Sequence, residues 1–196
     1  MLKIGLTGGI GSGKTFVSMI FRELNIPVYE ADKEARRLME TSTRLINSIK
    51  NEFGEESYSN SRLNRSYLAD IVFKNADKLQ TLNMLVHPVV HADFESWCNQ
   101  YIDRSYVVEE AAILFETGAA AKMDYIVYVK ADLETRIKRV IDRDGLSREE
   151  VMHRISRQGN EYDKEKSADF IISNDIDSMI LPQIVDLHNR FLKTEQ

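Results

Sequence analysis

Short apolar runs alternate with amphipathic segments along this chain. Leu2, Ile4 and Leu6 fit a short buried strand, and apolar positions at helical spacing predict a helix over 14–24. Further strands are predicted at 27–29, 106–108, 125–129 and 170–172, and an amphipathic helix is predicted over 179–191. Strands that alternate with helices in this way predict an α/β fold with a parallel sheet in a three-layer arrangement.

The length and charge of the chain exclude several function classes. Its 196 residues suit one domain with excursions and not two independent domains. The net charge of −5 disfavours nucleic acid as a partner, because sequence-independent binding to a phosphate backbone needs a basic face. No apolar run is long enough to span a membrane, so we expect no membrane partner either.

Cysteine and histidine usage points to a cytoplasmic protein without a zinc site. Cys98 is the single cysteine, which excludes an internal disulfide, and no signal peptide is recognisable. His87 and His91 lie four residues apart, but the glutamate of H-E-x-x-H is missing and Pro88 follows His87 directly. We therefore expect a reducing compartment and no zinc.

A glycine-rich turn joins the first predicted strand to the first predicted helix. The string Gly8-x-x-x-x-Gly13-Lys14-Thr15 matches the P-loop pattern G-x-x-x-x-G-K-[ST]. Glycines let the backbone wrap around phosphates in conformations that a Cβ forbids, and the positive end of the helix then faces the anion. In this motif the lysine reaches the β- and γ-phosphates, and the threonine hydroxyl can ligate Mg²⁺. The turn therefore predicts a nucleotide-phosphate site.

The loop predicts a nucleotide but does not specify a reaction. A GTPase would carry N-K-x-D for guanine, which is absent, and Asp142-Arg143-Asp144-Gly145 reads D-x-x-G only inside a helical, arginine-rich stretch. A mechanical ATPase would need a longer chain. A small-molecule kinase fits the length best, and it requires an acceptor pocket, a proton acceptor and cations near the transferring phosphoryl group.

The carboxylate of Asp32 follows the strand predicted at 27–29, within the string Glu30-Ala31-Asp32. A carboxylate at the carboxyl edge of a parallel strand lies on the rim where ligands bind, which makes Asp32 a candidate general base. Aspartate is also a favoured helix N-cap, and a helix is predicted to begin near this position. The residues alone leave both interpretations open.

Six arginines gather in a segment of helical character. Arg136, Arg139 and Arg143 lie three and four residues apart on one helix face, and Gly145 followed by Ser147 marks the end of one helix and the start of the next. A helical hairpin of this kind can close over phosphates as a lid, whereas any single arginine can instead be a solvated side chain with an acidic partner. The set is Arg136, Arg139, Arg143, Arg148, Arg154 and Arg157, and the acidic residues beside it include Asp142, Glu149 and Glu150.

Together these motifs resemble the dephospho-CoA kinase family over nearly the whole chain. Beyond the loop no single motif is specific, but their order and spacing are. The strings that carry the resemblance are Gly5-Leu-Thr-Gly-Gly-Ile-Gly-Ser-Gly-Lys14, Glu30-Ala31-Asp32, Leu63-Asn64-Arg65, Leu68-Ala69, Ile71-Val72-Phe73, His87-Pro88, Ile113-Leu114-Phe115-Glu116, Arg139-x-x-x-Arg143-Asp144, Arg154-x-x-x-Gln158, and Ala168-Asp169 through Asn174.

The resemblance implies phosphorylation of the 3′-hydroxyl of the dephospho-CoA ribose by ATP with Mg²⁺, the last step of coenzyme A biosynthesis. It makes Asp32 the base toward the ribose hydroxyl, with Lys14 and Arg139 as further catalytic residues. It places Arg143 near the phosphates and Asn174 beside the adenine. The residues that it implies hold the ATP phosphates are Gly11, Ser12, Gly13, Lys14, Thr15 and Phe16.

The same resemblance divides a single P-loop kinase domain, 1–196, into parts. It implies a core of about 1–31, 104–135 and 167–196, a helical acceptor-binding insertion of about 32–103 and a helical lid of about 136–166. His87 would help to shape the acceptor cleft, whereas plain core packing is predicted for Tyr67, Phe73 and Trp97. We expect a monomer with ATP and dephospho-CoA as its small-molecule partners.

Three positions depart from the family pattern, and none of them removes a reacting group. Glu30 replaces an aspartate, Phe16 stands where threonine is common, and Ala112 stands where proline is often found. For the metal, Glu110 at the end of the strand at 106–108 is the predicted Walker-B-like carboxylate, together with the hydroxyl of Thr15. The competing carboxylates are Glu109 and Glu116.

Other functions stay open at the level of sequence. A nucleoside monophosphate or shikimate-type kinase would share the loop and the lid but take another acceptor. A non-catalytic module would bind ATP only as a structural ligand, and Asp32 together with the arginine set argues against it. A nucleic-acid or adaptor protein is disfavoured by the acidic balance.

Overall fold

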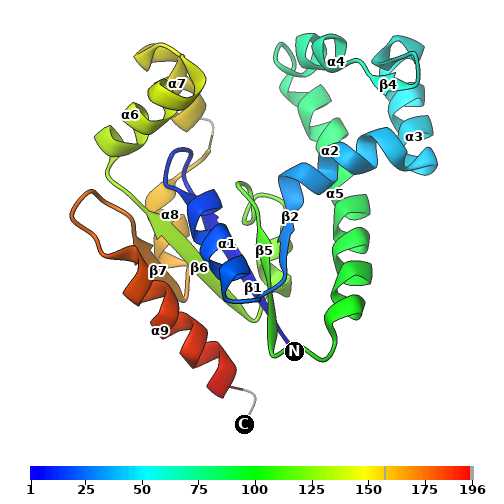
Figure 1. Cartoon of the computed structure of the whole chain (residues 1–196). Coiled ribbons are helices and arrows are strands. Elements are labelled where there is room, and N and C mark those ends of the chain that lie inside the picture. The colour runs from blue at the N-terminus through cyan, green and yellow to red at the C-terminus, as the bar shows by residue number, and fades with distance from the viewer. Residues whose placement is uncertain (157, 195–196) are drawn as a thin grey trace. The chain divides into compact units, whose positions relative to one another are not determined.

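The predicted strands form a five-stranded parallel sheet. The computed structural model describes residues 1–156 and 158–194, and its sheet has the strand order β2-β5-β1-β6-β7 (Figure 1). Every neighbouring pair in this sheet runs parallel, which confirms the α/β fold class. The strands are β1 (Leu2–Gly8), β2 (Val28–Glu30), β5 (Tyr106–Glu110), β6 (Tyr125–Lys130) and β7 (Phe170–Ser173).

The chain divides into two compact units. The first comprises residues 1–30 and 101–196 and contains the sheet, and the second comprises residues 31–100. The 3₁₀ turn η2 (Asn99–Tyr101) spans the boundary. The other helical elements of the first unit are α1 (Lys14–Glu23), η3 (Ala119–Lys122), α6 (Leu133–Asp144), α7 (Arg148–Ser156), α8 (Glu161–Lys166) and α9 (Ile180–Lys193).

Helices α1 and α9 cover one face of the sheet (Figure 1). Their apolar stripes are buried against β1, where Ile4 and Leu6 have no exposed surface. Burial of each such side chain contributes about 1.5–3 kcal/mol. The residues that α1 and α9 bury in this core are Val17, Phe21, Ile184, Leu187 and Phe191.

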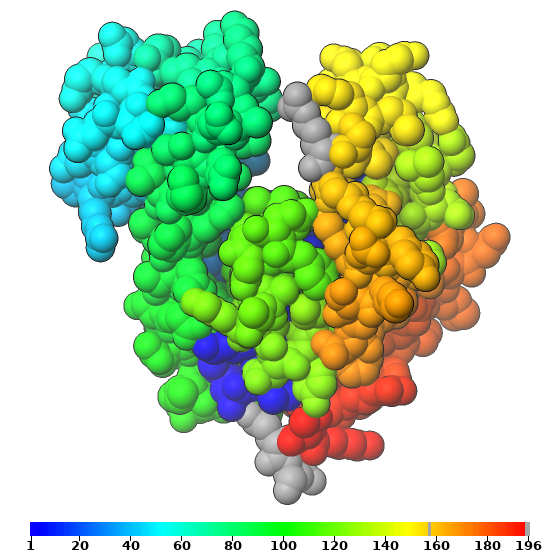
Figure 2. Space-filling view, turned by 180° about the vertical axis from the view of Figure 1, so that it is seen from behind, coloured from blue at the N-terminus to red at the C-terminus, as the bar shows by residue number. Residues whose placement is uncertain are grey.

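Helix α8 and the segment 111–123 lie on the other face of the sheet (Figure 2). Lys164 of α8 pairs with Glu116 of this segment. Leu114 packs so closely on β1 that a Cβ on Gly5 would overlap it. The sheet is therefore covered on both faces, as expected for a three-layer arrangement.

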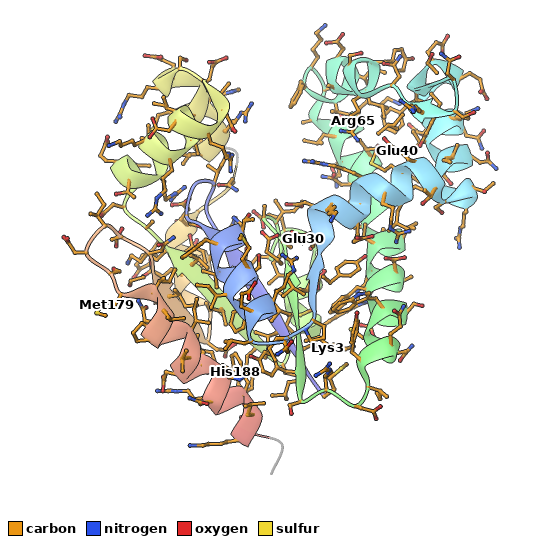
Figure 3. All side chains as sticks on the ribbon, in the orientation of Figure 1. Lys3, Glu30, Glu40, Arg65, Met179 and His188 are labelled. Atoms are coloured by element: carbon orange, nitrogen blue, oxygen red, sulfur yellow. The ribbon has the colours of Figure 1, made fainter. Side chains whose placement is uncertain are left out.

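The second unit consists of four helices and a short hairpin. An ion pair between Arg37 and Asp93, at 2.8 Å, joins α2 to α5, and Glu40 pairs with Arg65 at 3.2 Å (Figure 3). Asn60 and Ser61 both have positive φ, as a two-residue hairpin turn requires. The elements are α2 (Ala31–Thr41), α3 (Thr43–Phe53), η1 (Glu55–Ser57), β3 (Tyr58–Ser59), β4 (Arg62–Leu63), α4 (Arg65–Val72) and α5 (Ala76–Cys98).

The packing prediction for the aromatic residues of this unit holds for two of three. Tyr67 is partly buried and donates its hydroxyl to the Phe53 carbonyl at 2.9 Å, and the Trp97 ring stacks on Phe94 at a centroid distance of 6.0 Å. Core packing is wrong for Phe73, which is 66% exposed. The reason is its place at the C-cap of α4, one residue beyond the buried Val72.

The first unit contains a partly buried histidine whose titration should affect stability. His188 of α9 (Figure 3) shares a hydrogen bond of 2.7 Å through Nδ1 with the buried Tyr106 hydroxyl. Burial lowers the pKa of His188 below its ordinary value. The unfolded chain therefore takes up this proton at a higher pH than the folded chain.

We expect the stability contributed by neutral His188 to be complete above about pH 7.5 and to be lost as the pH falls through about 6.5. Urea unfolding between pH 7.5 and 5.5 measures this loss. The variant His188→Gln should show a smaller dependence of the unfolding free energy on pH. An unchanged dependence in the variant would assign the effect to other groups.

Within residues 1–156 and 158–194, none of the helices has the length and apolar character needed to cross a bilayer.

Candidate active site

The glycine-rich turn lies where β1 ends and α1 begins. β1 ends at Gly8 and α1 begins at Lys14, as the P-loop pattern predicts. The Lys14 Nζ folds back over the turn and donates to the carbonyls of Gly8, at 2.7 Å, and Gly9, at 3.3 Å. Gly13 has φ 95°, and a Cβ there would overlap Asn174 Nδ2, so both the backbone and the packing require glycine.

The first turn of α1 presents the residues expected to meet phosphates. Thr15 and Phe16 are exposed, so the replacement of the common threonine by Phe16 leaves this helix terminus accessible. Ser12 is 1% exposed, and its Oγ has no hydrogen-bond partner among the described residues. Helix N-terminal amides and the helix dipole favour an anion at this end.

Asn174 and Arg139 connect the turn to the end of β7. The Asn174 Nδ2 donates to the Ser12 carbonyl at 2.7 Å, and the Arg139 Nη2 donates to the Asn174 carbonyl at 2.9 Å. The Arg139 Nη1 is buried and has no partner within the described ranges. The structure therefore brings together three of the predicted elements, namely the loop, one arginine of α6 and the asparagine after β7.

The remaining arginines differ from Arg139 in their surroundings. Arg143 and Arg154 both pair with Asp144, at 2.8 and 3.5 Å, and Arg148 pairs with Glu134 at 2.6 Å. The side chains of these three arginines are at least half exposed. These three arginines are therefore solvated side chains with acidic partners, which was the alternative to a role at the phosphates. The partners are Asp144 and Glu134 and not Asp142, Glu149 or Glu150. Arg157 lies outside the described residues.

The helical hairpin predicted for the lid segment is present. α6 ends at Asp144 with Gly145 as its C-cap, at φ 67°, and α7 begins at Arg148. The Ser147 Oγ accepts from the Glu150 amide, and the Glu150 carboxylate accepts from the Ser147 amide at 2.8 Å. This reciprocal pair is a capping box, which fixes the start of α7.

The three candidate metal carboxylates lie in different places. Glu110 of β5 is a register partner of Leu6, which packs against α1, so Glu110 points to the α1 face of the sheet. Glu109 pairs in register with Gly5 and points to the opposite face. Glu116 pairs with Lys164. Among the described residues no three acidic, histidine or cysteine side chains converge as a metal-ligand cluster.

Glu30, one of the departures from the family pattern, lies on the same face of the sheet as Glu110. The two residues are register partners on β2 and β5. Arg22 of α1 pairs with the Glu30 carboxylate at 3.2 Å. The longer glutamate side chain at this position therefore contacts a helix of the first unit.

Asp32 and His87 belong to the second unit. Asp32 is exposed in the first turn of α2, two residues after β2 ends. His87 is half-buried in α5, and burial lowers the pKa of its imidazole below the ordinary value. His87 is therefore neutral at pH 7 and can donate or accept a hydrogen bond through the imidazole.

Sequence reasoning did not single out the residues that hold the middle of the turn. The Ile10 carbonyl accepts one hydrogen bond from Arg136, and the Ile10 amide donates one to Gln158. Arg136 belongs to the arginine set, and Gln158 is the last residue of the string Arg154-x-x-x-Gln158 that resembles the family. Neither position carries a local pattern that would have assigned it to the loop.

Comparison with known proteins places this site in a family. The model of the dephospho-CoA kinase family matches residues 2–179. A dephospho-CoA kinase of Bacteroides fragilis strain YCH46 is 37% identical over 186 residues, which cover 95% of this chain and 91% of that protein.

Solved structures share the fold of this chain. TT1252 from Thermus thermophilus superposes with a TM-score of 0.87 at 33% identity, over 98% of both chains. A dephospho-CoA kinase from Campylobacter jejuni has the same fold, with a TM-score of 0.73 at 24% identity over 99% of this chain and 98% of that one. The chain belongs to the dephospho-CoA kinase family.

Proposed function

We propose that this protein transfers the γ-phosphoryl group of ATP to the 3′-hydroxyl of the dephospho-CoA ribose, giving coenzyme A and ADP. The observation that carries the proposal is the glycine-rich turn at the carboxyl end of β1, with Lys14 on it and Asn174 and Arg139 beside it. Ligands of open parallel sheets bind at this edge. The family match favours dephospho-CoA over a nucleoside monophosphate or shikimate as the acceptor.

The proposed reaction is an in-line displacement at phosphorus. The 3′-oxygen forms a bond to the γ-phosphorus, the bond to the β,γ-bridging oxygen breaks, and ADP leaves. Asp32 accepts the hydroxyl proton, while Lys14 and Arg139 offset the charge that develops on the phosphoryl oxygens. A loose phosphoryl transition state leaves most of the catalysis to positioning and electrostatics.

The remaining roles are those that the resemblance to the family implies. Asn174, next to the Ser12 carbonyl, is proposed to lie beside the adenine. Arg143 is proposed to leave its ion pair with Asp144 and to pair with the phosphates instead. His87, on α5 of the second unit, is proposed to contact the acceptor. Gly11, Ser12, Gly13 and Phe16 contribute backbone amides at the phosphates.

Mg²⁺ fits the residues of the first unit. The hydroxyl of Thr15 is exposed at the start of α1, and Glu110 is the candidate carboxylate that points to the α1 face. Oxygen donors of this kind, with waters and substrate phosphates, are the ligands that Mg²⁺ prefers. When bound, the ion would neutralise charge on the β- and γ-phosphates. We therefore assign the metal role to Glu110 and not to Glu109 or Glu116.

A substrate panel tests the proposal. The protein is mixed with ATP, Mg²⁺ and 3′-dephospho-CoA, and ADP release and the mass of the product are followed. We expect a product heavier by one phosphoryl group, and no turnover of nucleoside monophosphates or shikimate. ADP formation with one of those acceptors and none with dephospho-CoA would reverse the assignment, and ADP formation with no acceptor would indicate a binding module.

The protein is further proposed to act as a monomer in the cytoplasm. Its one cysteine, Cys98, is buried and has no second cysteine in the chain with which to form a disulfide, which suits a reducing compartment. Sedimentation of the purified protein measures the oligomeric state.

A further inference from the structure

The middle of the glycine-rich turn is held by side chains from the segment that follows β6. The Arg136 Nε of α6 donates to the Ile10 carbonyl at 2.9 Å, and the Ile10 amide donates to the Gln158 Oε1 at 2.7 Å. Both polar backbone groups of Ile10 are thus satisfied by residues that lie more than 120 positions away in the sequence. A loop backbone binds phosphate through amides held in a defined conformation, and these two hydrogen bonds restrain the conformation of Ile10.

Arg136 is the buried member of the arginine set. It is 3% exposed, and its Nη1 makes an ion pair of 2.5 Å with the carboxylate of Glu161, the first residue of α8. A buried guanidinium is costly unless it is paired and hydrogen-bonded. Its planar set of donors lets one side chain hold the Ile10 carbonyl and the carboxylate together, which a lysine cannot do in the same geometry.

The same ion pair packs directly on Gly9. A Cβ at Gly9 would overlap the Arg136 guanidinium and the Glu161 carboxylate, so a side chain at this loop position would displace the pair. Tyr128 of β6, which is 3% exposed, also has a hydrogen bond with the backbone of Gly9. Burial, followed by the charge of Glu161, raises the pKa of Tyr128 to about 12, so the phenol stays neutral in this contact.

A second residue of α8 supports the other side of Ile10. Lys164 donates to the backbone carbonyl of Gln158, whose side chain accepts from the Ile10 amide, and it also pairs with Glu116. One turn of α8 therefore supports the Ile10 carbonyl through Arg136 and the Ile10 amide through Gln158.

We propose that Arg136 and Glu161 form a positioning pair that holds Gly9 and Ile10 in the phosphate-gripping conformation, so that α8 sets the affinity of the loop for ATP. The inference rests on the proposed function in taking ATP as the ligand of the loop. Neither residue contacts the reacting atoms in this role. Loss of the pair should weaken the binding of nucleotide and leave the acceptor side unchanged.

The variant Glu161→Gln tests the pair with little risk to folding, because the Glu161 side chain is about one-third exposed. We expect the Kd for ATP, measured by calorimetry without acceptor, to rise about tenfold, the size of one lost charged hydrogen bond. The KM for ATP should rise in parallel, while the KM for dephospho-CoA stays within twofold of the wild-type value. Hydrogen exchange of the peptide that covers residues 8–13 should become faster.

Glu165→Gln is the matched control. Glu165 lies on the same helix and pairs with Lys130 at 2.7 Å, not with an arginine of α6. This variant should lose the surface ion pair and retain the Kd for ATP. A rise in the Kd for ATP in both variants, or a folded Glu161→Gln variant with a Kd within twofold of wild type, would overturn the proposal.

A double-mutant cycle tests whether the two residues act as one unit. Arg136→Gln should weaken ATP binding at least as much as Glu161→Gln, and adding Glu161→Gln to it should change the Kd by less than twofold. Additive effects would show that the residues act separately and would contradict the pair. If the wild-type protein binds ATP but does not phosphorylate dephospho-CoA, the proposed activity is refuted. The Kd values for ATP would still test the role of the Arg136–Glu161 pair. Absence of ATP binding in the wild type would overturn both.

Discussion

Replacement of Asp32 by asparagine is expected to lower kcat by about 10²–10⁴, the contribution of a positioned proton acceptor. The affinity for ATP should change by less than about twofold, because the proposed role of Asp32 concerns the acceptor hydroxyl and the phosphates are proposed to bind at the turn after β1. Steady-state kinetics with dephospho-CoA give kcat, and calorimetry without acceptor gives the Kd for ATP.

The control for this variant addresses the alternative that Asp32 only stabilises the start of a helix. Asp77 is likewise an exposed aspartate in the first turn of a helix of the second unit, in this case α5. Asp77→Asn should remove a comparable helix-dipole interaction, worth about 0.3–1 kcal/mol, and leave kcat unchanged. Near-normal turnover of Asp32→Asn would rule out its role as the base.

Replacement of Lys14 by alanine is expected to lower kcat by about 10²–10³ and to raise the KM for ATP, since the variant removes the charged donor proposed to contact the phosphates. In the structure the Lys14 Nζ is bonded to the Gly8 and Gly9 carbonyls, which places it over the turn. Stopped assays with varied ATP separate the two parameters. Lys14→Arg should not restore activity, because a planar guanidinium cannot occupy the position of a compact ammonium group.

Lys138→Ala serves as the control for charge. Lys138 is an exposed lysine of α6 in the same unit, so its loss changes the net charge by the same amount without touching the turn. Its kinetics should match those of the wild type. If Lys14→Ala retains normal kcat together with tight ATP binding, the turn after β1 is not the phosphate site.

The glycine-rich turn and the side chains that support it differ in how far the sequence could predict them. The turn from Gly8 to Thr15 was found because its residues are neighbours in the chain and its chemistry depends on their spacing. The support of Ile10 was not found, because Ile10 and Gln158 are 148 positions apart and no local pattern connects them. The arginine set could be recognised as a group, but separating Arg136 from its solvated neighbours required knowledge of burial.

The amino-acid sequence alone was enough to predict the alternation of strands and helices, the class of the sheet and the glycine-rich turn, because each of these is encoded in hydrophobic period and local spacing. Three features required the folded structure: the strand order β2-β5-β1-β6-β7, the exposure of Phe73, and the support of the turn by α8 through Arg136 and Gln158. These features depend on which distant segments pack together and exclude water. The hydrophobic pattern of one segment does not specify which other segments it contacts.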